Sequence, residues 1–115
     1  MNKDMKLSIN LVAYECHCIA SSKGWHDKEQ TIPDTIANIH AELSEAWEEY
    51  RKNKGVTETY YSEEGKPEGI PSELADVVIR VFDACVEMKI DIVTAIEEKM
   101  EYNKSRTYRH GNKKA

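Results

Sequence analysis

The stretch from Glu73 to Met88 reads ELADVVIRVFDACVEM, and it decides the fold of this chain. Placed about 100° apart, as on an α-helix, its apolar residues cover most of the circumference. Four charged side chains share the narrow stripe that remains, and they are Glu73, Asp76, Arg80 and Asp83. A helix that is apolar on most sides is a buried helix, where acidic groups are costly unless a cation pairs with them. The stretch therefore predicts a buried helix whose acids are neutralised by Arg80 and by a divalent metal ion.

A second acidic pair, Glu42-x-x-Glu45, lies in the preceding helical stretch. Residues three apart on a helix share a face, so each pair presents two carboxylates together. If the two helices pack side by side, Glu42, Glu45, Glu73 and Asp76 converge, and four carboxylates so close repel one another without a cation. Oxygen ligands of this kind favour Mg²⁺, with Mn²⁺ as an alternative. The pattern predicts these four acids as metal ligands and catalytic residues.

Helical periodicity covers almost the whole chain and predicts an all-α fold, a four-helix bundle in a single domain of residues 1–115. Thr31 is expected to cap the second helix, with Asp34 in the capping-box position, and Asp91 is expected to cap the fourth. The expected helices cover residues 5–22, 31–53, 71–88 and 92–106.

The second helix carries an apolar stripe nearly opposite its acids. On this helix alone, the acids can therefore simply face solvent while the stripe faces the core. The segment 53–70 contains three glycines and a proline, which is typical of a long loop or a hairpin-like insertion. The residues of the apolar stripe are Ile36, Ile39, Leu43, Trp47 and Tyr50.

Composition narrows the class of protein. The chain has 115 residues and a net charge of −5, and no apolar run reaches the roughly 20 residues of a membrane span. No signal peptide is visible, so we expect a cytoplasmic protein without a membrane partner. The acidic balance argues against nucleic-acid binding, although residues 107–115 are expected to form a mobile basic tail. Cys16, Cys18 and Cys85 fit no zinc pattern and are expected to be buried or partly buried thiols.

The fourth expected helix presents a basic face that suits a nucleotide. Lys99 and Arg106 can neutralise phosphate oxygens, and Asn103 and Tyr102 can contact a base or ribose. The simpler alternative is a helix end whose basic residues complement the helix dipole. Three further residues are candidate contacts to a nucleobase, although Trp47 can equally be a core residue; they are Trp25, His26 and Trp47.

Three ordered segments resemble the MazG-like all-α nucleotide pyrophosphohydrolases, over roughly residues 36–111. They are Ala41-Glu-Leu-Ser-Glu-Ala46, then Glu73-Leu-Ala-Asp-Val-Val-Ile-Arg80, then Lys99-x-x-x-Asn103-x-x-Arg106 followed by His110-Gly. Two features depart from the family pattern: Ala41 stands where the family often has a further glutamate, and the 53–70 segment is long.

The resemblance implies Mg²⁺-dependent hydrolysis of a nucleoside triphosphate to a monophosphate and pyrophosphate. The four acids would be the metal ligands, and Lys99, Asn103 and Arg106 would contact the nucleotide. It also implies a homo-oligomer, a dimer or tetramer with sites near subunit interfaces. Asp83, on the same stripe as Arg80, is expected to hold that arginine in place. Two alternatives stay open: a phosphoribosyl-ATP pyrophosphohydrolase, and a non-catalytic helical regulator that binds metal or nucleotide.

Overall fold

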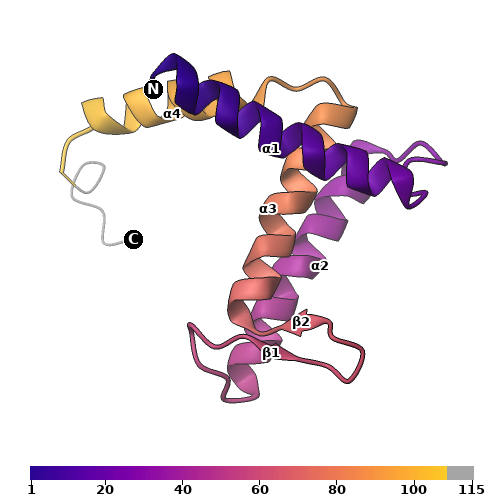
Figure 1. Cartoon of the computed structure of the whole chain (residues 1–115). Coiled ribbons are helices and arrows are strands. Elements are labelled where there is room, and N and C mark those ends of the chain that lie inside the picture. The colour runs from indigo at the N-terminus through magenta and orange to yellow at the C-terminus, as the bar shows by residue number, and fades with distance from the viewer. Residues whose placement is uncertain (109–115) are drawn as a thin grey trace.

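The computed structural model describes residues 1–108 and is mainly helical, as the periodicity predicts (Figure 1). Most of the predicted tail, from residue 109 onward, lies outside the described residues, and so does the His110-Gly motif. No helix in residues 1–108 combines the length and the apolar character that crossing a membrane requires. The elements are α1 (Lys3–Ser22), α2 (Ile32–Arg51), β1 (Tyr60–Tyr61), β2 (Pro67–Glu68), α3 (Ile70–Glu87) and α4 (Ile92–Ser105).

Local capping fixes where α2 and α4 begin. The Thr31 hydroxyl accepts a hydrogen bond from the Asp34 backbone N–H, and the Asp34 carboxylate accepts one from the Thr31 N–H, which completes a capping box. The Asp91 carboxylate accepts from the Thr94 backbone N–H at the start of α4. Both predicted caps are therefore confirmed, because side-chain oxygens here satisfy N–H groups that the helix leaves free.

The helix α3 begins differently, at a glycine. Gly69 is its N-cap and has a φ of 118°, a backbone conformation that favours glycine. A Cβ at this position would collide with the backbone carbonyl oxygen of Glu58. The glycine thus lets the hairpin segment lie directly against the first turn of α3.

The helices α2 and α3 lie side by side, and α1 packs across α3 near its C-terminal half (Figure 1). The helix α4 packs mainly against α1, so within one chain it extends the structure instead of completing a bundle with α2 and α3. The radius of gyration is 16.7 Å. A compact chain of this length has a value of about 13 Å. The arrangement is therefore open.

Short strands β1 and β2 form an antiparallel hairpin between α2 and α3, with Tyr60 opposite Glu68. The Tyr60 hydroxyl donates a 2.7 Å hydrogen bond to the Glu49 carboxylate on α2. Glu49 is only 6% exposed and is the one buried acid of the described residues. This bond fastens the hairpin to the C-terminal end of α2.

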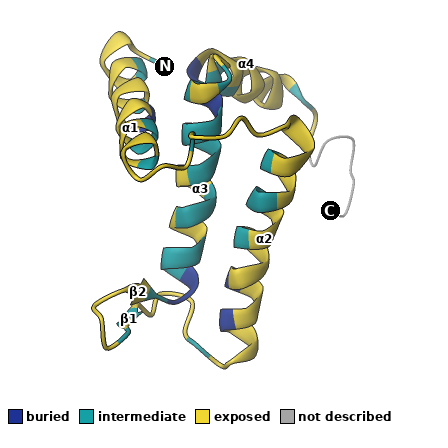
Figure 2. Cartoon of the chain, turned by 90° about the vertical axis from the view of Figure 1, so that its right-hand side faces the viewer, coloured by how far each residue is buried: buried dark blue, intermediate teal, exposed yellow. Residues whose placement is uncertain are grey.

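Four of the five residues in the apolar stripe of α2 face outward and Ile39 is half-buried, which contradicts the alternative that the stripe as a whole faces the core. Leu43, Trp47 and Tyr50 are 49%, 59% and 58% exposed, and Ile36 is similarly open. Glu42 instead faces α3, because Arg80 on α3 offers it an ion pair. Figure 2 shows the consequence, since the side of α2 toward α3 is less exposed than the side away from it.

The core of the single chain is small. Leu74, Val78 and Ile79 on α3 are about half exposed, so α3 is less buried than its sequence predicts. Of the cysteines, Cys85 is buried and Cys16 is half-buried, whereas Cys18 is exposed, in contrast to its predicted burial. The buried apolar residues are Ala13, Ala46, Ile70, Cys85 and Val93.

Candidate metal centre and nucleotide cavity

Three carboxylates meet between α2 and α3. One oxygen each from Glu42, Glu73 and Asp76 lies within 4.8 Å of the other two. Glu73 and Asp76 share a face of α3 because they are three residues apart, and the side-by-side packing of α2 brings Glu42 opposite them. Three half-buried carboxylate groups from two rigid helices form a set of hard oxygen donors, which fits Mg²⁺.

Burial and mutual repulsion both act on this cluster. Burial, and then the charges of Asp76, Glu45 and Glu42, raise the pKa of Glu73. Burial, and then the charge of Glu42, raise the pKa of Asp76, although Arg80 and Lys66 act in the opposite direction. The cluster therefore has a negative electrostatic potential, and a bound cation would relieve the repulsion between its carboxylates.

The fourth predicted acid, Glu45, lies beside the cluster instead of within it. It is exposed, it lines the same cavity as the other three acids, and its charge acts on Glu73. The Glu45 carboxylate is thus close enough to interact electrostatically with Glu73, and it remains exposed to water. This placement suits a proton acceptor better than it suits a ligand enclosed by the protein.

Arg80 forms the strongest polar link across the site. Its Nε and Nη2 atoms both lie 2.8 Å from the same Glu42 oxygen, Oε1. The guanidinium also lies over the Trp25 ring, 5.1 Å from the ring centre. Arg80 therefore neutralises one acid of the cluster, as its position on the stripe predicts, and it places an aromatic ring at the cavity edge.

Asp83 does not hold Arg80 in the way that the sequence suggests. It lies one turn further along α3, where α1 and the loop after it cross, and its carboxylate contacts two histidines there. Asp83 Oδ1 is 2.7 Å from His26 Nε2 and 3.1 Å from His17 Nδ1. Within the described residues, Asp83 therefore pairs with the two imidazoles and has no ion pair with Arg80.

A cavity of about 580 Å³ opens beside the carboxylates. This is within the usual size range of small-molecule sites. Five acids line it, the four predicted ligands and Asp83, together with aromatic and basic side chains from the loop after α1, from the β1–β2 turn and from α3. Lys66 comes from the β1–β2 turn. The sequence does not reveal this contribution, because helical spacing does not determine where a turn lies relative to α3. The non-acidic charged or aromatic lining residues are Lys23, Trp25, His26, Lys66 and Arg80.

The predicted contacts on α4 lie elsewhere in this chain. Lys99 and Arg106 both lie over the Tyr102 ring, at 5.3 Å and 5.4 Å, so the predicted basic face exists. However, none of the described residues that line the cavity comes from α4, so Lys99, Tyr102, Asn103 and Arg106 are apart from it. Trp47 is also outside the lining, and its exposed ring stacks on Tyr50 at 5.6 Å.

Comparison with models of protein families, with curated proteins and with solved structures gives no match to this chain.

Proposed function

We propose that the chain is a Mg²⁺-dependent nucleoside triphosphate pyrophosphohydrolase of the MazG-like kind, which converts (d)NTP and water to (d)NMP and pyrophosphate in nucleotide-pool housekeeping. One observation carries the proposal: carboxylates from α2 and α3 converge at the wall of a cavity that also presents cations and an indole. Hard oxygen donors suit the metal, the cations suit phosphate oxygens, and the indole suits a base.

Glu42, Glu73 and Asp76 would hold the metal. When bound there, Mg²⁺ neutralises phosphate charge and makes water a better nucleophile. Manganese can replace it, since Mn²⁺ accepts the same donors. The three half-buried carboxylates are already held by helix packing, so little reorganisation is needed to receive the ion.

The surrounding side chains have separate roles in the proposal. Glu45 is exposed to the cavity and accepts a proton from the water that attacks the α-phosphorus. The bond from that phosphorus to the bridging oxygen then breaks, and pyrophosphate leaves. Arg80 uses Nε and Nη2 on Glu42, and its other N–H groups, together with Lys66, bind phosphate oxygens. Trp25 stacks on the base, and His26 lies beside it.

A second copy of the chain is part of this proposal. The basic face of α4 does not line its own cavity, and the apolar stripe of α2 is exposed. Soluble chains rarely leave so much apolar helix surface open, so we propose a dimer or tetramer. In that assembly α4 of one copy supplies Lys99, Asn103 and Arg106 to the cavity of another. Size-exclusion chromatography with light scattering gives the number of chains directly.

The test of the activity is pyrophosphate release from a panel of standard and modified NTPs and dNTPs, with and without Mg²⁺. Metal-dependent release by the wild-type chain, absent in Glu42→Gln and Asp76→Asn, supports the proposal. Pyrophosphate release from phosphoribosyl-ATP and from no other substrate would show that the chain is instead a phosphoribosyl-ATP pyrophosphohydrolase. Nucleotide binding by folded, metal-loaded protein without release from any substrate contradicts catalysis and identifies a regulator.

A further inference from the structure

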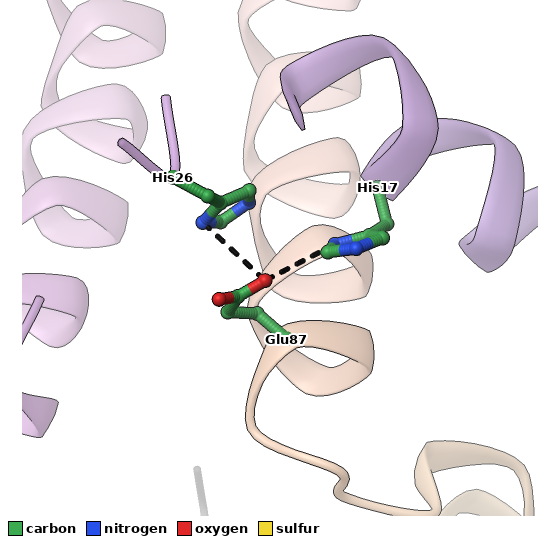
Figure 3. Close-up of side chains that lie close together, drawn as sticks. All are labelled: His17, His26 and Glu87. Carbon is green, nitrogen blue, oxygen red and sulfur yellow. Dashed lines mark ion pairs between the residues drawn. The ribbon is translucent and has the colours of Figure 1, made fainter. Parts of the chain in front are cut away.

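A second group of metal-ligating side chains lies outside the carboxylate cluster. His17 from α1, His26 from the loop after α1 and Glu87 from the last turn of α3 each offer one atom within 4.8 Å of the others. Figure 3 shows the two imidazoles turned toward the Glu87 carboxylate from different parts of the chain. The ring centres are 5.1 Å apart. Side chains from α1, from the loop that follows it and from the distant end of α3 therefore converge on one point.

The distances within this group fit ligands around one ion better than they fit hydrogen bonds. Glu87 Oε2 lies 3.6 Å from His17 Nδ1 and 3.6 Å from His26 Nδ1. A nitrogen and an oxygen at that separation do not form a hydrogen bond. Two ligands bound tetrahedrally at about 2.1 Å from zinc lie roughly 3.4 Å apart. Both separations between Glu87 and the imidazole nitrogens are thus close to those of ligands around a tetrahedral ion.

The other nitrogen of each imidazole is already oriented. His26 Nε2 is 2.7 Å from Asp83 Oδ1, which leaves Nδ1 to face Glu87. His17 Nε2 is 3.4 Å from the Ser21 hydroxyl, one turn along α1, which leaves Nδ1 to face the same point. Metal-binding histidines characteristically donate their second N–H to a carboxylate or similar acceptor. His26 has this arrangement, with Asp83 as the acceptor, whereas the second nitrogen of His17 has only the Ser21 hydroxyl beside it.

Asp83 also lies 3.1 Å from His17 Nδ1, so a hydrogen-bond network accounts for part of the cluster. That network does not include Glu87, whose carboxylate turns toward two ring nitrogens at ion-pair distance without a hydrogen bond to either. An ion at this point would take the His17 Nδ1 lone pair and leave Asp83 with His26. The negative charge of Asp83 would then increase the basicity of His26 as a metal ligand.

We propose that His17, His26 and Glu87 form a site for a borderline divalent metal ion of the Zn²⁺ class, separate from the Mg²⁺ site. Imidazole nitrogen favours zinc, whereas a site of carboxylates alone favours magnesium. A cavity of about 340 Å³, lined by His26, Asp83 and Glu87 among others, adjoins the point and leaves room for a water or an anion as fourth ligand. The inference rests on this geometry and holds whether or not the chain hydrolyses nucleotides.

Such an ion would tie α1 and its following loop to the end of α3. The same loop carries Trp25, and His26 and Asp83 line both cavities. The zinc site would therefore fix one wall of the cavity that the carboxylates share. Its two histidines are 20% exposed and Glu87 is 44% exposed, so an ion can reach them from solvent.

The test is a zinc competition titration of the full, metal-stripped chain against a chromophoric chelator, in millimolar Mg²⁺ to occupy the carboxylate site. We expect one zinc per chain, bound at least about tenfold more weakly by His17→Gln, His26→Gln and Glu87→Gln. Two controls should bind as the wild type does: His40→Gln, an exposed histidine on α2, and Glu73→Gln, in the other cluster.

Cobalt provides a second readout, because four-coordinate Co²⁺ absorbs visible light and circular dichroism checks that each variant folds. The proposal predicts a cobalt spectrum that His26→Gln removes and Glu73→Gln leaves intact. Three results would each overturn it: no zinc bound by the wild type under these conditions, zinc lost in Glu73→Gln but retained in the histidine variants, or equal weakening in His40→Gln.

Discussion

Arg80 Nη2 lies 2.8 Å from Glu42 Oε1, and this ion pair joins α3 to α2 directly beside the carboxylate cluster. Both partners are partly exposed, with side-chain accessibilities of 33% and 19%. One guanidinium pairs with one acid, and no ion pair within residues 1–108 involves Glu73 or Asp76. The pair therefore determines how much negative charge is left for a metal ion to neutralise.

Asp76→Asn should separate metal binding from stability. We expect it to reduce pyrophosphate release by on the order of 100-fold or more, since a direct ligand matters at least as much as its second-shell partners. The metal-free variant should melt at the same temperature as the wild type or higher, because repulsion within the cluster falls. Added Mg²⁺ should raise the melting temperature of the wild type more than that of the variant.

Differential scanning calorimetry with and without Mg²⁺ measures both effects. A clear drop in the melting temperature of metal-free Asp76→Asn would show instead that the carboxylate stabilises the fold by pairing with Arg80.

Arg80→Met should destabilise the metal-free chain by about 1 kcal/mol, because it leaves the half-buried Glu42 carboxylate unpaired. The loss should shrink in saturating Mg²⁺, since the ion replaces the missing positive charge. Urea unfolding followed by circular dichroism gives the free energy of unfolding in each condition. Arg51→Met is the matched control, because Arg51 pairs with Glu48 on the exposed side of α2. Equal losses in both variants would contradict a special role for Arg80.

Lowering the pH should stabilise the metal-free site. The pKa values of Glu73 and Asp76 are raised above their ordinary 4.5 and 3.8. A raised pKa adds stability that is fully present below the ordinary value and is lost as the pH rises through the raised value. Asp91 and Glu97 act oppositely, because hydrogen bonds from Thr94 and Lys6 lower their pKa values.

Subtracting the pH profile of a Glu73→Gln, Asp76→Asn double variant isolates the contribution of the cluster. We expect the wild type to gain melting temperature relative to the double variant from neutral pH down to the ordinary carboxyl pKa values. Saturating Mg²⁺ should flatten the wild-type profile, because the ion competes with protons for the same oxygens. Parallel profiles in the absence of metal would disprove the coupling.

Tyr60→Phe should loosen the hairpin, because it removes the only hydroxyl donor within the described residues that reaches the buried Glu49 carboxylate. The hydrogen bond to Glu49 is also the main reason that the pKa of Tyr60 is raised to about 12. An ultraviolet titration of the tyrosine phenols should therefore lack the ionisation at the highest pH, that of Tyr60, in this variant. Tyr61→Phe, at an exposed position on the same strand, should leave both the titration step and the urea midpoint unchanged.

Mixing two inactive variants tests whether α4 of one copy completes the cavity of another. An equal mixture of Asp76→Asn and Arg106→Ala chains, unfolded and refolded together, should recover roughly a quarter of the wild-type activity if the unit is a dimer, since half of the dimers are mixed and have one intact site. A mixture of Asp76→Asn and Glu42→Gln should stay inactive, because both changes lie on the same wall. Full activity of the Arg106→Ala variant on its own would show that Arg106 of α4 does not contribute to the site.

The helices and two of their caps are predictable because their causes are local. Thr31 and Asp91 cap helices through atoms three residues away, and helical spacing alone places Glu73 beside Asp76. The meeting of His17 with Glu87 is not predictable in this way. These residues come from opposite ends of the chain, and only the crossing of α1 over α3 brings them together.

The orientation of α2 is the other feature that sequence periodicity leaves undecided. An apolar stripe opposite an acidic face defines two sides of a helix, but it does not say which side meets the rest of the same chain. Here the ion pair with Arg80 turns Glu42 inward, while Leu43, Trp47 and Tyr50 face outward. The rule that apolar faces point to the core applies to a complete assembly, and in the proposed oligomer one chain is only part of it.

In the proposed oligomer, the outward stripe of α2 would make the protein unfold when it is diluted. If the stripe is covered only by another copy, burying apolar surface and associating are one event, and mass action governs both. The melting temperature should then rise with protein concentration, and activity should fall on dilution faster than the number of chains. Cellular abundance would thereby set how much of the protein is folded at all.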